Sequence, residues 1–142
     1  MSKSNTCENS ILLLLFNATT FADIAENDTS SPATNLYVSL HTGDPGETGT
    51  MATNECAYTS YARVAVARSG AGWTVTNNSV SPAATISFPA CTGGTETATH
   101  FGVGIGSSGA TVLLYKGAIT PNISISSGVT PQLTTATAIT ED

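Results

Sequence analysis

The sequence predicts an all-β fold, a sandwich or barrel of about eight short strands preceded by one N-terminal α-helix. Three observations lead to this prediction. A Leu-rich segment follows a capping residue, residues 35–41 alternate apolar and polar side chains, and short strand-like runs between turn residues fill the rest. The 142 residues suffice for one domain with its own core. We expect a single domain over 1–142, with the helix and a loop in 1–34 and the sandwich in 35–142.

The predicted helix covers Thr6–Asn17. Ser4 or Asn5 can cap it, and Glu8 is placed as the acid of a capping box. Residues 11–16 are apolar nearly all round, which predicts burial against the chain's own sheet or against a neighbouring subunit. This apolar run is shorter than that of a signal peptide and far too short to span a membrane. We therefore expect a retained structural helix, no cleaved signal peptide and no membrane partner.

Eight segments have the composition and alternation of strands. The clearest is Leu36–His41, in which Leu36, Val38 and Leu40 alternate with polar side chains. It runs into residues 42–46, where Pro45 and Gly46 are typical of a tight turn. The other seven segments are Tyr61–Arg68, Trp73–Thr76, Ala84–Phe88, Thr97–Ile105, Thr111–Tyr115, Ile123–Ile125 and Gln132–Ile139.

Charge is scarce in this chain. Charged residues make up 10% of it, whereas an average globular domain has about 25%. A surface built from Ser, Thr, Asn, Gly and Ala resists association only weakly. Such a surface is either covered by other subunits in the working state or is the hydroxyl-rich exterior of a secreted or adhesin-like domain. The net charge of −6 and the absence of a basic patch argue against a nucleic-acid partner, and we expect none.

The residues that could carry chemistry do not form a recognisable site. His41 and His100 are the only histidines, and Asp44 lies near His41, but no Gly-x-Ser-x-Gly elbow accompanies them. We expect each histidine to bind a backbone group at a strand end. The turn at 42–47 lacks the spacing of a calcium loop. The prediction is therefore a protein that is not an enzyme, with no catalytic, cofactor-binding or metal-binding residues and no cofactor.

The three cysteines are predicted to be free thiols. Cys7, Cys56 and Cys91 are odd in number and widely spaced, which argues against both a disulfide framework and a zinc site. Three reduced thiols are typical of a protein assembled in a cytoplasm.

Two arginines and a run of glycines suggest fixed contacts. Arg63 and Arg68 either have an acidic partner, with Glu55 and Asp44 nearest in sequence, or face solvent. In Gly102–Gly106 every second residue is glycine, which leaves one face of a strand without side chains. An aromatic ring, another sheet or a subunit must then pack closely there.

At these motifs the chain resembles a family of small bacteriophage virion proteins, some of which are described as structural or tail-fibre proteins. The resemblance rests on the apolar helix Cys7–Phe16, the strand and turn Leu36–Gly46, and Glu55 followed by Tyr61-Ala62-Arg63. It continues through Thr99–Val103 and the turn at Gly109. Cys56 departs from the pattern, because a small polar residue is expected there.

The resemblance implies a structural role in the virion. Some similar proteins are capsid cement proteins with a jelly-roll sandwich, bound outside the head shell at subunit junctions. The chain is then expected to be a cement or decoration protein on the capsid surface, with the major capsid protein and further copies of itself, as a dimer or trimer, as partners. The alternative is a tail-fibre or receptor-binding domain that contacts host surface glycans. Assembly is expected in the host cytoplasm.

Overall fold

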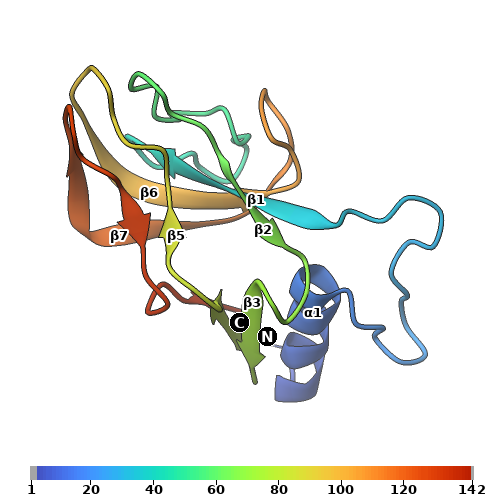
Figure 1. The fold of residues 1–142 in the computed structure, drawn as a ribbon. Coiled ribbons are helices and arrows are strands. Elements are labelled where there is room, and N and C mark those ends of the chain that lie inside the picture. Colours follow the sequence, from blue (N-terminus) through green and yellow to red (C-terminus); the bar gives the residue numbers. More distant parts are fainter. Residues whose placement is uncertain (1–2, 142) are drawn as a thin grey trace. The chain divides into compact units, whose positions relative to one another are not determined.

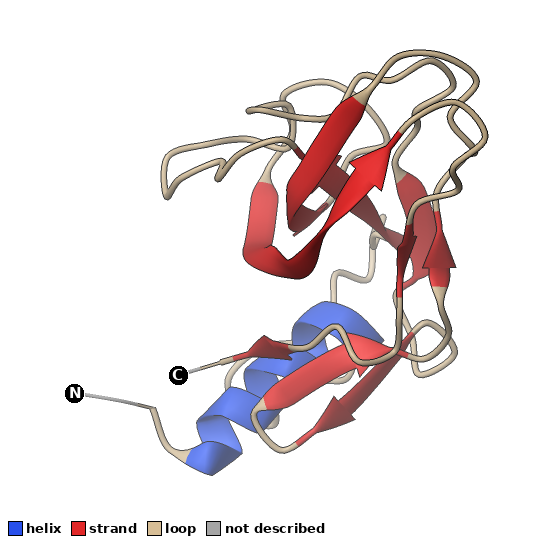
Figure 2. Ribbon diagram, turned by 90° about the vertical axis from the view of Figure 1, so that its left-hand side faces the viewer, coloured by secondary structure: helices blue, strands red, loops and turns tan. Residues whose placement is uncertain are grey.

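The structure is a computed structural model that describes residues 3–141 (Figure 1). This described range contains one helix and nine strands, and every strand pairing with a resolved register is antiparallel. Figure 2 shows the predominance of strands over the single helix. The predicted all-β class with one N-terminal helix is confirmed. The elements are α1 (Asn5–Asn17), β1 (Asn35–His41), β2 (Val64–Ala67), β3 (Trp73–Thr76), β4 (Ser79–Pro82), β5 (Ile86–Ser87), β6 (Glu96–Gly104), β7 (Leu113–Ile125), β8 (Gln132–Leu133) and β9 (Ile139–Thr140).

The chain divides into two compact units. The first consists of the described residues up to Asn35 together with Val66–Thr85 and the segment from Leu133 onward. The second consists of Leu36–Ala65 and Ile86–Gln132. A single domain over residues 1–142 and a jelly-roll order of strands both stay predictions.

Helix α1 begins where the sequence places a cap. The Ser4 side chain accepts a hydrogen bond from the Cys7 backbone N–H at 3.4 Å, so Ser4 is the N-cap and Asn5 is not. Glu8 consequently lies one position beyond the acid of a capping box. The helix ends at Asn17, and its C-cap Ala18 has a left-handed backbone (φ 55°). The Thr19 N–H that follows donates to the Leu13 carbonyl at 3.1 Å. The predicted bounds were short by one residue at the start.

The core of the first unit joins the helix to a small sheet. Leu12 and Phe16 are fully buried on α1, which packs on β3 and β4, and Figure 1 shows the helix beside β3. The Phe16 and Trp73 rings meet edge to face with their centroids 4.9 Å apart. The burial predicted for the apolar segment 11–16 is therefore confirmed for Leu12 and Phe16, against the chain's own sheet, whereas the other four side chains are half-buried.

That sheet has the order β3-β4-β9 and includes a strand that the sequence analysis missed. Strand β4 pairs with β3 from Thr76↔Ser79 to Trp73↔Pro82, across a turn in which Asn77 has a positive φ. Residues 79–82 contain Pro82 and two serines, and this composition did not indicate a strand. The predicted segment Gln132–Ile139 is also wrong as one strand, because it forms the separate strands β8 and β9.

The second unit contains most of a four-stranded sheet of order β2-β1-β6-β7. Strand β1 pairs with β6 from Tyr37↔Gly104 to His41↔His100, and β7 lies along the other side of β6. Leu36, Val38 and Leu40 are buried, as their alternation predicts. Ser39 and His41 on the other face are buried as well, so the end of β1 is enclosed on both faces. Strand β7 joins the two segments that we expected separately at 111–115 and 123–125. An irregularity at residues 119–122, which include Pro121, lies between them.

The chain's own side chains fill the space beside the glycines of β6. A Cβ atom on Gly102 would stand 2.8 Å from His41 Nε2 and from Ser39 Oγ, and one on Gly104 would collide with Met51. On the opposite face, a Cβ atom on Gly117 would stand 2.6 Å from the ring of Phe101, its partner in the register. The predicted close packing is confirmed, and it does not require a neighbouring subunit.

Candidate functional site

Arg63 is the most heavily bonded side chain of the second unit. Its Nε and Nη2 atoms donate to the two carboxylate oxygens of Glu55 at 2.7 and 2.8 Å. The Arg63 side chain is 2% exposed and that of Glu55 is 17% exposed. The bidentate pair holds the pKa of Arg63 above its usual value. The predicted acidic partner of Arg63 is therefore confirmed as Glu55.

Arg63 also binds the turn between β6 and β7. Its Nη atoms donate to the Gly106 carbonyl at 2.8 Å, the Gly109 carbonyl at 2.7 Å and the Thr111 hydroxyl at 3.2 Å. A single guanidinium thus connects a loop residue, Glu55, to three points of a turn about fifty residues further along the chain.

Tyr61 ties the same ion pair to the sheet. Its hydroxyl donates to Glu55 Oε1 at 2.9 Å and accepts from the Leu40 backbone N–H at 3.1 Å. Burial raises the pKa of the Tyr61 hydroxyl, which therefore remains a donor at neutral pH. We call Arg63, Glu55 and Tyr61, with the turn that they hold, the Arg63 cluster.

Arg68 has a different kind of partner, in the first unit. Its Nε and Nη2 atoms donate to the carbonyls of Leu15 and Leu14 at 2.7 and 2.6 Å, in the last turn of α1. A further N–H donates to the Asn27 side chain. Because these acceptors are neutral, burial is the dominant influence, and it lowers the pKa of Arg68. The acidic partner considered for Arg68 is replaced by the carboxyl end of a helix, where a cation is stabilised.

His41 and Ser39 are close together but enclosed. His41 Nε2 lies 2.8 Å from Ser39 Oγ, and Nδ1 lies 2.8 Å from the Thr53 carbonyl, so Nδ1–H donates and Nε2 accepts in the neutral tautomer. Both residues are 0% exposed, and burial lowers the pKa of His41. A nucleophile and a base stand at hydrogen-bond distance here, yet no substrate can reach them. The backbone partner that we predicted for His41 is confirmed as Thr53.

Asp44 and His100 lie apart from that pair. Asp44 Oδ1 accepts from the Gly46 N–H at 2.8 Å and pairs with Lys116 Nζ at 3.0 Å, and these two donors hold the pKa of its carboxyl below the usual value. His100 Nδ1 lies 2.9 Å from the Thr99 hydroxyl rather than from a backbone group. The structure therefore does not assemble a Ser/His/Asp triad from these residues.

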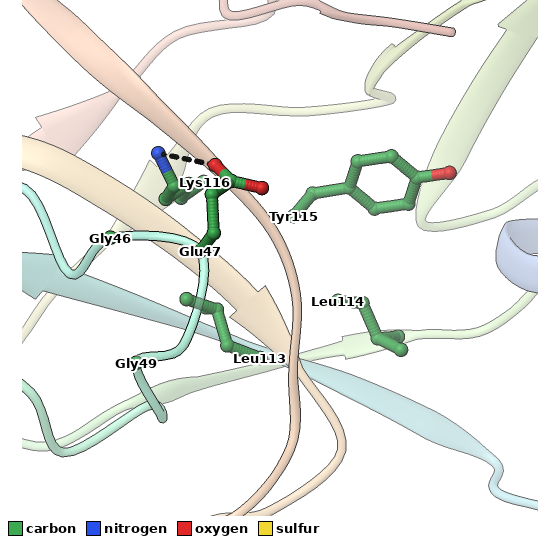
Figure 3. A pocket seen from close by; sticks show the side chains of 7 residues that line it. All are labelled: Gly46, Glu47, Gly49, Leu113, Leu114, Tyr115 and Lys116. Atoms are coloured by element: carbon green, nitrogen blue, oxygen red, sulfur yellow. Dashed lines mark ion pairs between the residues drawn. The ribbon is translucent and has the colours of Figure 1, made fainter.

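The loop after β1 and strand β7 enclose a shallow pocket of about 260 Å³. Figure 3 shows the Glu47 carboxylate beside the Lys116 ammonium, and Leu113 pointing toward the loop that carries Gly46 and Gly49. The Glu47 Oε1 and Lys116 Nζ atoms are 3.2 Å apart. Glu47 is 92% exposed and Lys116 is 24% exposed. The rim of this pocket is thus an ion pair open to solvent, above an apolar side chain.

The cysteines are unpaired in the structure. Cys56 and Cys91 are buried and Cys7 is half-buried. Burial raises the pKa of Cys56 to about 12, so this thiol is protonated and unreactive at neutral pH. The Cys91 thiol donates to the Gly93 carbonyl at 3.2 Å. The departure of Cys56 from the family pattern therefore places a buried thiol in the loop that leads to Arg63.

Across residues 3–141 no three His, Cys, Asp or Glu side chains gather where they could hold a metal ion. In the same residues, no helix has the length and apolar character that crossing a membrane requires. Sequence reasoning missed Met51, Thr53 and Thr111 as partners of the chosen residues. The sequence of a loop does not indicate which backbone carbonyl or which methionine sulfur will accept a hydrogen bond from a distant side chain.

Comparison with known proteins identifies the family. A family model described as "Podophage GP4 fiber I protein gp80" matches residues 2–140. No curated protein matches the chain. The family assigns a structural role in the phage virion, in agreement with the resemblance of the sequence motifs. Because the match covers nearly the whole length, this chain belongs to the podophage GP4 fiber I protein gp80 family.

Proposed function

We propose that this chain is a non-enzymatic structural subunit of the tail fibre of a podophage. The observation that carries the proposal is the match of a fibre-protein family to residues 2–140. The function consists of binding other virion proteins, and the exposed hydroxyl-rich surface of the fibre contacts host surface glycans.

The geometry supports a role in binding rather than in catalysis. The nucleophile and base that lie within hydrogen-bond distance, Ser39 and His41, are both fully buried. Arg63, whose guanidinium could otherwise stabilise a developing negative charge, uses its donors on Glu55 and on the turn between β6 and β7. The polar side chains that could take part in catalysis thus form hydrogen bonds that hold the loops of the protein in place.

A capsid cement role is the second candidate. The ordered motifs Leu36–Gly46 and Tyr61–Arg63 resemble those of cement proteins as well as those of fibre proteins. In this case the partner is the major capsid protein, and the chain acts as a dimer or trimer on the outer face of the head. The scarcity of charge suits either location, because interface cores are depleted in charged residues.

The location of the protein in purified virions tests the proposal. Mass spectrometry gives its copy number, and electron microscopy with an antibody against the chain gives its position. A few copies at the tail are expected. Copies spread over the head, together with heads that lose their genome at lower temperature when the protein is missing, would replace the fibre assignment with the cement role. Absence from the virion would refute both.

A further inference from the structure

The turn between β6 and β7, residues 105–112, is exposed and carries no charge. We call it the hairpin tip. Ile105 is 49% exposed and Val112 is 55% exposed, and the Ile105 N–H donates to the Val112 carbonyl at 3.4 Å, so the two apolar side chains are neighbours. The residues between them are glycine, serine, alanine and threonine. Between Glu96 and Lys116 the sequence contains no Asp, Glu, Lys or Arg.

A buried guanidinium fixes the conformation of this tip from beneath. Arg63 binds the Gly106 and Gly109 carbonyls and the Thr111 hydroxyl, while Glu55 balances its charge. Removing both charges from water is costly, and a buried ion pair is weak support for stability compared with an apolar core. What this ion pair supplies is one fixed conformation of an exposed turn. A binding element that is already ordered loses less entropy when it docks.

We propose that the hairpin tip is a preformed docking element for another protein of the virion. The partner surface is uncharged and hollowed, and it accepts the Ile105 and Val112 side chains. This inference rests on the proposed structural role in the virion, and it names the surface through which the chain is held. Apolar side chains at the centre of a contact, with few charges around them, are typical of the cores of stable interfaces.

Charges at two hollows of this chain favour a different protein as the partner over a second copy. The pocket beside β7 has Glu47 and Lys116 on its rim. A second hollow, formed by residues 20–26, contains Asp23 and Glu26. An uncharged tip that entered either hollow would remove these charges from water without offering a partner, which is unfavourable.

Complementation of a phage that lacks the gene tests the inference. The chain is supplied from a plasmid as wild type, as Ile105→Asp or as Val112→Asp, and its copies per purified particle are counted by mass spectrometry. The control is Ile24→Asp, which changes an apolar side chain that is 73% exposed and lies outside the tip. Thermal unfolding of each purified variant verifies that it is folded. Because all three side chains are at the surface, the three variants should unfold at about the same temperature as the wild type.

Both tip variants are expected to lower incorporation about tenfold or more, as a loss of about 1.4 kcal/mol of binding produces, while Ile24→Asp is incorporated like the wild type. Equal incorporation of tip and control variants would overturn the inference but leave the structural role intact. Failure of the wild type to enter particles would instead refute the structural role. If the tip variants alter only self-association in solution, the partner is a second copy and the inference is wrong.

Discussion

Arg63 and Arg68 are five positions apart in the sequence, yet the two units of the molecule bind them in different ways. In the second unit, Arg63 meets a carboxylate and links a loop to a turn. In the first unit, Arg68 meets the last carbonyls of a helix. A fully buried guanidinium requires an ionised carboxylate as its partner. A guanidinium at the carboxyl end of a helix is stabilised by the partial negative charges of the last backbone carbonyls. The same side chain therefore stabilises loops in one unit and a helix terminus in the other.

The largest effect is expected from removing the countercharge of Arg63. Glu55→Ala leaves a guanidinium that is 2% exposed without its partner, and this should lower the free energy of unfolding by about 3–5 kcal/mol. Urea unfolding measures the loss. The matched control is Glu47→Ala, because the Glu47 side chain is 92% exposed and its ion pair with Lys116 contributes little. Equal losses for the two variants would contradict the role assigned to burial.

A somewhat smaller loss is expected in the first unit, where packing rather than charge is decisive. Leu12 is 0% exposed between α1 and its sheet, so Leu12→Ala should cost about 2–5 kcal/mol through lost burial and the resulting cavity. Leu14→Ala, at a half-buried position of the same helix, serves as the control and should cost less. The same urea titration compares them. A larger loss for Leu14→Ala would indicate that the helix buries a different face.

The third prediction tests the helix-end arginine. Arg68→Ala removes hydrogen bonds from a charged donor to the Leu14 and Leu15 carbonyls, and such bonds contribute about 1.5–3 kcal/mol. Arg68→Lys keeps the cation near the helix dipole and should lose less. Circular dichroism of the helix during thermal unfolding follows both variants. If Arg68→Lys is as unstable as Arg68→Ala, the fork geometry and not the charge is what matters.

Mild acid should produce the smallest effect, and it should act on one unit only. His41 and His100, the two histidines, both belong to the second unit. Burial lowers the pKa of His41 in the folded state. Below the unfolded pKa of about 6.5, His41 is therefore protonated in the unfolded chain while it is still neutral in the folded chain. Stability is therefore complete above this pH and decreases as the pH falls toward the lowered value. Hydrogen exchange resolved by segment should show faster opening around Thr53, with α1 unchanged.

The His41→Gln variant provides the control for that experiment. Its amide can still bind Ser39 or the Thr53 carbonyl, but it does not titrate, so this part of the pH dependence should disappear. If the variant shows the same decrease between neutral pH and mild acid, a group other than His41 is responsible.

Local patterns in the sequence were enough to predict the helix and the main strands. The Ser4 cap and the segment Trp73–Thr76 each depend on neighbouring residues, and both appear in the structure. The alternation in β1 predicted its apolar face, but not the burial of Ser39 and His41 on the other face. Strand β4 was missed because its alternation covers only four residues, one of them Pro82, and its register depends on pairing with β3. Strand β7 was divided because Pro121 indicated a break, although the strand is continuous and only its pairing with β6 is irregular there.

The candidate site was predictable only where a side chain met another side chain. Glu55 is eight positions from Arg63 and is among the few acids available, so the ion pair could be anticipated. The acceptors of Arg68 could not, because backbone carbonyls belong to every residue and leave no trace in the sequence. Likewise, the alternating glycines predicted a close contact on β6. That Met51 fills the space beside Gly104 could not be predicted, because it depends on how a loop distant in the sequence folds.

The pair formed by Phe101 and Gly117 limits how this protein can vary. The two residues stand opposite each other in the register, and the aromatic ring occupies the space where a side chain on residue 117 would begin. A larger side chain at one of these two positions therefore requires a smaller side chain at the other. A larger residue at 117 is tolerated only when 101 shrinks, so a double substitution such as Phe101→Leu with Gly117→Ala should fold better than Gly117→Ala alone. Mutational libraries that vary single positions would classify Gly117 as immutable, whereas libraries that vary both would find it permissive.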